Sequence, residues 1–264
     1  RAVLRVADRC EIILAMSGTM YRSDRKRIAF VSYDEAGNPE KPDVSYGRKQ
    51  AVEEGAKWPI DVKWVEGSTL WETIEGEEVE SPTSPAKELV RPHMLHGLVH
   101  HEGFVRELLA RGVSHWLAHR QTNKRAQCIV VTASQDLAEI VCDDLRAQLR
   151  GVKVDLAISR DTSKRRRAVK RYRKRDLDLL VSVGMAYEGL DAPSTTHVIC
   201  LRGYRSAPWL EQCADRATRI DPGNKFKDRA WIFLPGTEDL RASWDAIQAE
   251  QTLGVKSPSK ECGL

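Results

Sequence analysis

Gln212, Arg216 and Arg219 combine residue types and a spacing that suit phosphate chemistry. They fall at positions i, i+4 and i+7, so a helix carrying them would present one carboxamide and two guanidiniums along a single stripe. Guanidinium groups form charge-assisted hydrogen bonds to phosphate oxygens. The spacing therefore predicts a phosphate-facing stripe on a helix.

An apolar run at residues 177–183 predicts the element that positions a second set of polar residues. The run ends in a glycine-containing turn that carries Glu188, Gly189 and Asp191. Buried parallel strands of open α/β sheets deliver such residues to their carboxyl edge, where ligands bind. We expect the turn to lie at a ligand-binding edge.

Together the two segments resemble motifs V and VI of superfamily 2 (DEAD/DEAH-like) helicases. Residues 188–191 (EGLD) are similar to motif V and residues 212–219 (QCADRATR) to motif VI, in the family's order and separation. The resemblance implies that both motifs sit on the second of two RecA-like domains. There they complete an ATP site whose phosphate-binding loop lies on the first domain.

The resemblance implies catalytic roles for three residues. Arg216 and Arg219 would stabilise negative charge that develops on the γ-phosphate, and Gln212 would orient the phosphate or a water. One departure concerns Asp215, which stands where the family often has glycine. Its carboxylate is next to Arg216 in the sequence and could pair with it.

Nucleotide binding is implied for the motif V residues. Asp191 would accept from the ribose or hold the motif VI arginines, Gly189 would allow close backbone approach, and Glu188 would link the motif to the domain interface. ATP and Mg²⁺ would be bound mainly by a missing N-terminal domain.

Three hydroxyl residues are the expected contacts to a nucleic-acid strand. Residues 132–134 (Thr-Ala-Ser) resemble motif IV, where a helix N-terminus can receive a backbone phosphate, which assigns Thr132 and Ser134. Val183 stands where many family members have a threonine that contacts the strand, which leaves Ser182 as the nearer hydroxyl.

Near the start of the chain, Ser17, Gly18 and Thr19 follow a short apolar run and resemble motif III, which couples the NTP state to domain movement. Downstream, Asp34 and Glu35 end another apolar run and have the outline of a magnesium-binding Asp-Glu box. Their neighbours are turn formers, and the family's box precedes motif III, so a hairpin loop is favoured.

The phosphate-binding loop itself is missing from the sequence. A Walker A loop ends in Gly-Lys-Ser/Thr, and none of the 17 glycines is followed by lysine. The sequence begins at Arg1 rather than Met, so we expect a fragment or a processed chain. Alone, it should not hydrolyse ATP.

The expected fold class is α/β, with a RecA-like parallel sheet flanked by helices. Strands are predicted at 128–132, 152–158, from 177, at 197–201 and at 230–234, alternating with helices at 136–149 and 162–172. Residues 95–120 predict one long or two short helices, and residues 43–55 a short helix before a strand at 60–65. This last pattern is similar to the end of the first domain in the excision-repair and restriction-type branch.

Domain boundaries follow from composition. We assign residues 1–70 to the C-terminal remnant of the first RecA-like domain, residues 71–90 to a linker rich in acidic residues, serine and proline, and residues 91–264 to the second domain. The partner domain would belong to the same or another chain.

Composition sets outer bounds. The 264 residues are 41% hydrophobic and carry a net charge of +4, which by itself does not indicate nucleic acid. The six cysteines lack metal spacing, and six of the seven histidines, between positions 93 and 119, lack acidic or cysteine partners at ligand spacing, so no metal site is predicted. No stretch is long enough to span a membrane. We expect a reducing, cytoplasmic location and leave a phage or prokaryotic origin open.

A dense basic run lies between positions 160 and 175. Only Asp161 opposes ten basic residues there: Arg160, Lys164, Arg165, Arg166, Arg167, Lys170, Arg171, Arg173, Lys174 and Arg175. The run is compatible with a solvated helix face and with a contact to a nucleic-acid backbone.

The favoured hypothesis is the C-terminal part of an ATP-dependent DNA or RNA helicase or translocase that tracks along a single strand. A non-catalytic nucleic-acid-binding or regulatory module with a RecA-like fold is the alternative, favoured by the missing Walker A loop. A third hypothesis, the motor of a restriction or phage-defence enzyme, lacks support from a nuclease residue set.

Overall fold

The structure is a computed structural model that describes residues 31–33, 35, 46–66, 68–72, 78–82, 97–183, 190–202 and 207–253. The chain divides into two compact units, Arg1–Tyr46 and Gly47–Leu264. All elements discussed below belong to the second unit.

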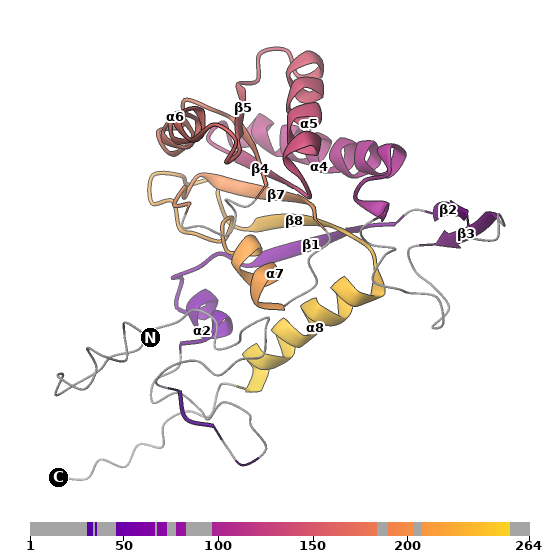
Figure 1. Cartoon of the computed structure of the whole chain (residues 1–264). Coiled ribbons are helices and arrows are strands. Elements are labelled where there is room, and N and C mark those ends of the chain that lie inside the picture. The colour runs from indigo at the N-terminus through magenta and orange to yellow at the C-terminus, as the bar shows by residue number, and fades with distance from the viewer. Residues whose placement is uncertain are drawn as a thin grey trace, which may run out of the picture. The chain divides into compact units, whose positions relative to one another are not determined.

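A six-stranded parallel sheet forms the centre of this unit (Figure 1). Its order is β1-β8-β7-β4-β6-β5, and every neighbouring pair is parallel. The strands are β1 (Ile60–Val65), β4 (Gln127–Thr132), β5 (Val154–Ala157), β6 (Leu179–Ser182), β7 (Thr195–Leu201) and β8 (Ala230–Pro235). The predicted α/β class and strand positions are thereby confirmed.

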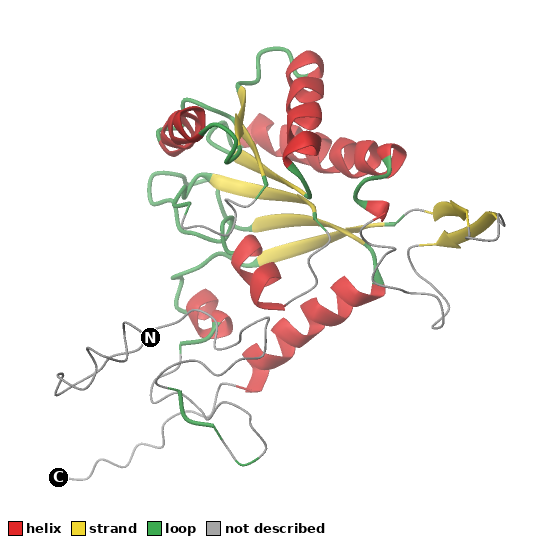
Figure 2. Cartoon of the chain, in the orientation of Figure 1, coloured by secondary structure: helices red, strands yellow, loops and turns green. Residues whose placement is uncertain are grey.

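Helices connect the strands and cover both faces of the sheet (Figure 2). They are α2 (Arg48–Glu53), α4 (Glu102–Thr122), α5 (Gln135–Gln148), α6 (Thr162–Arg173), α7 (Ala207–Ala214) and α8 (Glu238–Leu253). One buried cluster contains residues of α4 and α5, and the other contains residues of α6, α7 and α8. Strand residues alternate between these two clusters, as the period of two requires.

Strand β4 shows this alternation clearly. Cys128 and Val130 belong to the cluster under α4 and α5, whereas Ile129 and Val131 belong to the cluster on the opposite face. All six β4 residues are buried because the strand lies inside the sheet with helices on both sides. A continuous apolar run is therefore the right sequence signal for it.

The predicted helix starts have side-chain caps. Ser134 Oγ accepts a hydrogen bond from the Leu137 amide at 3.2 Å, and an Asp161 carboxylate oxygen accepts one from the Lys164 amide at 2.9 Å. These caps satisfy amides that have no partner inside the helix, and they fix α5 and α6 directly after β4 and β5.

Strand β1 lies in the same sheet as the C-terminal strands. It pairs with β8 in a register that joins Ile60 to Ala230 and Val65 to Pro235. The predicted division places residues 1–70 in the first domain, whereas β1, which lies in that range, belongs to the same sheet as the strands of residues 91–264. A short apolar strand does not itself encode which sheet it joins, and pairing with β8 decides it.

An antiparallel hairpin occupies part of the predicted linker. Its strands are β2 (Ser68–Glu72) and β3 (Glu78–Pro82), with Leu70 opposite Glu80.

The described helices include none with the length and apolar character needed to cross a membrane. Within the same residues, no group of three or more histidine, cysteine or acidic side chains is placed to hold a metal ion.

Candidate functional site

The carboxyl ends of β4 and β6 bring Thr132 and Ser182 together. Thr132 Oγ1 donates to the carbonyl of Ser134 at 3.0 Å and lies 3.4 Å from the carbonyl of Ser182. Both residues are fully buried, and Ser182 Oγ has no hydrogen-bond partner among the described residues. Of the three predicted strand contacts, Ser134 alone is partly exposed, at the N-terminus of α5.

Several predicted site residues lie outside the described part of the chain. These are Ser17, Gly18 and Thr19 of the motif III candidate, Asp34 of the alternative Asp-Glu box, and Glu188 and Gly189 of the motif V candidate. Glu35 lies in a turn. The described part of motif V begins with Leu190, which is buried, and Asp191, which is exposed.

The predicted helical stripe of Gln212, Arg216 and Arg219 is wrong. Helix α7 ends at Ala214, so it carries Gln212, which is half-buried, but neither arginine. Backbone bonds from Arg216 to the Cys213 carbonyl at 3.3 Å and from Ala217 to the Ala214 carbonyl at 3.0 Å tighten the chain into turns. The arginines are therefore placed by loop structure.

An upstream segment explains why the helix ends there. The Trp58 amide donates to the Thr218 carbonyl at 2.7 Å, and Lys57 forms an antiparallel β-bridge with Arg219. These contacts require an extended backbone near Thr218, and extended backbone cannot continue a helix. Tertiary contact thus overrides the helical spacing.

Arg216 is buried and ties motif VI to motif V. Its side chain donates from Nη1 to the Leu190 carbonyl at 3.3 Å, and the residue is only 9% exposed. Burial, followed by repulsion from Arg219, lowers the pKa of the Arg216 guanidinium. Its position indicates that it fixes the loop at Leu190.

Arg219 is the solvent-facing guanidinium of the pair. Its Nη1 forms an ion pair with Asp191 Oδ1, and the two side chains are 37% and 63% exposed. The structure therefore brings together two predicted site residues that are 28 positions apart. An exposed ion pair of this kind contributes little to stability and can open readily.

Asp215 does not pair with Arg216, which corrects the sequence expectation. Its carboxylate is held by Arg48 on α2 and by Lys57, whose Nζ lies 2.8 Å from Oδ2. Arg48 Nη2 also lies 3.8 Å from Glu211 Oε1. The acidic residue in the motif thus anchors the segment that precedes β1 to the turn after α7.

Two further residues that the sequence analysis missed join the loops on either side of β7. Lys227 is 2% exposed, and its Nζ donates to the carbonyls of Pro193, Thr195 and Arg219 at 2.6, 2.7 and 2.7 Å. Asp221 accepts from Ser194 Oγ at 2.9 Å. Both contacts link the loop that carries Asp191 to the loop that carries Arg219.

Asp221 has a second partner across the domain. Arg125 Nη2 donates to Asp221 Oδ1 at 3.1 Å, and Arg125 also contacts the Gly223 carbonyl. A Cβ atom at Gly223 would lie 2.7 Å from Arg125 Nη1, so a side chain there would displace the end of the flexible arginine. The loop after motif VI is therefore held by hydrogen bonds and ion pairs from Arg125, Ser194 and Lys227.

Comparison with known protein families matches residues 106–221 to the helicase conserved C-terminal domain. Among solved structures, the chain is similar to a fragment assigned to the HsdR subunit of a type I restriction enzyme from Vibrio vulnificus YJ016. That match has 16% sequence identity and a TM-score of 0.55, and it covers 77% of this chain and 36% of the other.

Two further solved structures are similar over a smaller part of the chain. The Pyrococcus furiosus Hef helicase domain has 20% identity and a TM-score of 0.39, covering 53% of this chain and 28% of the other. Saccharomyces cerevisiae Dbp5 bound to RNA and ADP BeF3 has 18% identity and a TM-score of 0.37, covering 47% and 32%. No match was found among curated proteins.

The family match confirms the predicted resemblance to a helicase C-terminal domain over residues 106–221, and the structural similarity confirms the RecA-like fold. The matched residues run from α4 to the loop after motif VI and include Gln212, Arg216 and Arg219. The chain spans about a third of the length of these three solved structures.

Proposed function

We propose that the chain is the C-terminal part of an ATP-dependent DNA or RNA helicase or translocase, because residues 106–221 match the helicase conserved C-terminal domain. The observation that carries this proposal is the partly exposed Arg219, held by Asp191 beside the buried Arg216. A purely structural turn does not require two arginines joined to the loop after β6.

In this proposal the two arginines have different roles. Arg219 is accessible, so it would leave Asp191 and reach the γ-phosphate, whereas Arg216 is buried and would hold the loop in place. Exchange of partners is feasible because the Arg219–Asp191 pair is solvent-exposed. Asp191 would then be available to the ribose, as the sequence resemblance implies, and Gln212 to a phosphate or water.

ATP would be the substrate, with Mg²⁺ held mainly by a complete first RecA-like domain in the same or another chain. Guanidinium groups stabilise charge on the transferring phosphoryl group, and one such arginine can raise the rate by about 10³ to 10⁵. Motif VI of this chain would supply that contribution once the first domain closes on it.

The proposed nucleic-acid strand would run along the carboxyl edge of the sheet. Ser134 is partly exposed at the N-terminus of α5, where backbone amides favour a phosphate. Thr132 and Ser182 are buried, so they could contact the strand only if the loops at the carboxyl edge of the sheet moved to expose them. Ser134 is therefore the better candidate contact.

The proposal is tested by measuring ATPase activity with and without single-stranded DNA or RNA. The assay compares this chain, this chain joined to a complete upstream domain with a Walker A loop, and the joined protein carrying Arg219→Ala. We expect turnover only in the joined protein and a loss of about 10³-fold or more in the Arg219 variant, with nucleotide binding retained.

Arg106→Ala is the matched control, because Arg106 is exposed on α4 and its described ion pair is with Glu102 of the same helix. It should leave turnover unchanged. If the joined protein is inert while the chain still binds nucleic acid, the motor assignment fails and the non-catalytic binding module takes its place.

A further inference from the structure

Helix α6 is fixed to the sheet by its inner face. Ala168 and Tyr172 are buried, and the Tyr172 hydroxyl lies 3.0 Å from Thr195 Oγ1. Anchoring on this side leaves the outer side of the helix to solvent. None of the basic residues of α6 is buried, so they lie on the parts of the helix that face outward or sideways.

Part of this positive charge is neutralised locally. Arg160 pairs with Asp136 at 2.8 Å and with Glu139 at 3.2 Å, and Arg171 pairs with Asp155 at 2.8 Å. These pairs join α6 and the loop before it to α5 and β5. The charges of Arg160 and Arg171 are therefore neutralised by carboxylates of the same domain.

Another part of the charge has no such partner. Arg166, Arg167 and Lys170 form no ion pair with a carboxylate within the described part of the chain, and all three are exposed. Lys174 follows at the C-cap and is exposed as well. Exposed like charges in one patch repel each other, which favours binding of an anionic partner.

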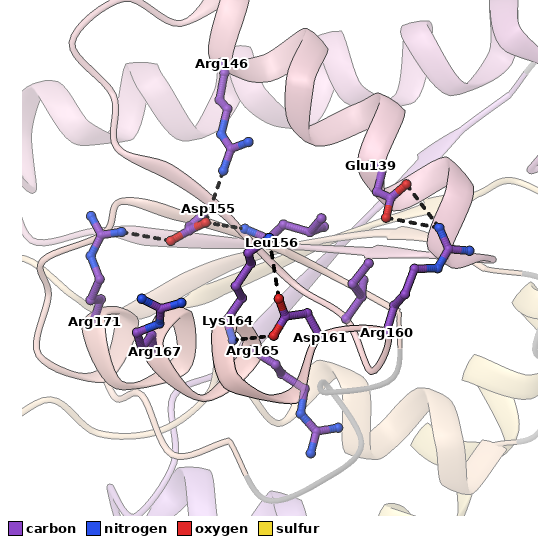
Figure 3. Close-up of a pocket in the computed structure, with 11 residues that line it drawn as sticks. Glu139, Arg146, Asp155, Leu156, Arg160, Asp161, Lys164, Arg165, Arg167 and Arg171 are labelled. Atoms are coloured by element: carbon purple, nitrogen blue, oxygen red, sulfur yellow. Dashed lines mark hydrogen bonds and ion pairs between the residues drawn. The ribbon is translucent and has the colours of Figure 1, made fainter.

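A cleft of about 660 Å³ lies beside these residues, between α5, β5 and α6 (Figure 3). Acidic side chains in it are Glu139, Asp155 and Asp161, which are the partners of basic residues described above. Its basic side chains outnumber them two to one: Arg146, Arg160, Lys164, Arg165, Arg167 and Arg171. The cleft and the outer face of α6 therefore form one positive surface, which we call the α6 surface.

The direction of α6 takes this surface away from the candidate ATP site. The helix begins after β5 at the carboxyl edge and, as a crossover between parallel strands, runs back toward the amino edge. Its 12 residues span about 18 Å. Lys170 and Lys174, near the end of α6, therefore lie toward the amino edge of the sheet, whereas Ser134 lies at the carboxyl edge.

We propose that the α6 surface binds the phosphate backbone of a nucleic-acid duplex, outside the strand path at the carboxyl edge. This inference rests on the proposed function, and it adds a duplex region of the nucleic acid as a second part of the substrate. Guanidinium and ammonium groups bind phosphates, and a row of residues spaced by three and four lies about 5–6 Å apart along a helix.

The composition of the surface favours a duplex over a single strand. Proteins that bind single strands combine a basic groove with aromatic side chains on which bases stack. None of the described residues that line the cleft is aromatic. Contacts limited to phosphates suit a double helix, whose bases are stacked inside and whose backbone lies outside.

The test measures binding of a 30-base-pair duplex and a 30-nucleotide single strand to the 264-residue chain by fluorescence anisotropy between 50 and 300 mM KCl. The variant combines Arg167→Gln, Lys170→Gln and Lys174→Gln. We expect duplex affinity to fall at least about tenfold and the slope of log K against log salt to become shallower by about 2.7, for three lost phosphate contacts.

A charge-matched control removes Lys49, Arg106 and Arg111, which are exposed elsewhere, by the same change to glutamine. A second variant keeps the charge, with Arg167→Lys, Lys170→Arg and Lys174→Arg. Both should bind the duplex as the parent does. An equal loss in the control, or an equal loss for single strand and duplex, overturns the proposal.

Two further measurements distinguish this proposal from the proposed ATPase function and from binding of an acidic polypeptide. Arg219→Ala should leave duplex binding unchanged, so failure of the ATPase assay does not affect the result. Competition by polyglutamate as effective as that by unlabelled duplex would assign the surface to an acidic polypeptide instead.

Discussion

Lys227 shows how a single side chain can hold the candidate site together. A lysine is rarely buried in a protein interior, yet this one is, and it donates to three carbonyls within 2.7 Å. Burial is the main cause that lowers the pKa of its ammonium to about 7. Its bonds connect the loops that carry Asp191 and Arg219.

We expect Lys227→Met to destabilise the protein. Methionine retains much of the volume but leaves the three carbonyls without their donor, and unsatisfied buried groups cost about 1–3 kcal/mol each. The melting temperature measured by calorimetry should fall by at least about 4 °C. Lys225→Met, at an exposed position two residues away, should change it little, and an equal shift in both would contradict the account.

At this scale the sequence predicted the residues that carry chemistry better than those that support them. Arg219 and Asp191 were predicted from motif order, and the structure pairs them. Arg48, Lys57 and Lys227 were missed, because each lies in a short or irregular segment where a basic residue has no periodicity that distinguishes it from surface charge. Their partners come from distant parts of the chain.

At the scale of elements, Gly112 lets α4 pack closely against Ile199 of β7. A Cβ atom there would lie 2.6 Å from Ile199 Cδ1 and 2.7 Å from Cγ1, well inside van der Waals contact. Gly112 costs helix propensity, about 1 kcal/mol relative to alanine, and permits the helix to pack against the strand. The close packing is visible in the buried cluster that α4 shares with β7.

Gly112→Val should therefore loosen this contact. Overpacking a close-packed core costs about 1–3 kcal/mol, because Ile199 and the helix must shift. The change should appear as a lower urea midpoint with an unaltered m-value. Ala110→Val places the same side chain on the exposed face of α4 and should cost only a few tenths of a kcal/mol. Helix propensity alone would make Gly112→Val slightly stabilising, because valine is a better helix former than glycine, so a loss no larger than that of Ala110→Val would contradict the packing account.

Strands and most helices were predictable because their signals are local. Buried parallel strands are apolar runs, and Ser134 and Asp161 mark helix starts by their side chains. The end of α7 was not predictable, since i, i+4 and i+7 spacing is compatible with a helix. Pairing of Lys57 and Trp58 with residues 218 and 219 decided it.

For the molecule as a whole, three histidines link stability to pH. His115 and His119 of α4 face His197 of β7, and His115 Nδ1 lies 2.9 Å from His197 Nε2. Burial is the largest cause that lowers the pKa of each ring. Charge repulsion adds to it, from Lys63 on the pKa of His115, from His115 on that of His119, and from both rings on that of His197. The folded state therefore favours neutral rings.

We expect the free energy of unfolding to fall as pH decreases below about 6.5, the ordinary histidine pKa. The unfolded chain takes up protons there that the folded state resists, so this contribution is fully present above that pH and is lost below it. Urea unfolding at pH 7.5 and 5.5 measures the change. His115→Gln with His119→Gln should flatten the dependence, and an undiminished slope would contradict the assignment.

The pairing of β1 with β8, and of β8 with β7, has a practical consequence for anyone who isolates the domain. The family match begins at residue 106 and ends at 221, so a protein cut at those limits lacks β1 and β8, the two strands at one end of the sheet. Strand β7 would become a bare edge with unpaired amides and carbonyls and an apolar sequence. Such edges template pairing between molecules, so the limits of sequence similarity here would produce an aggregating protein rather than a smaller functional one.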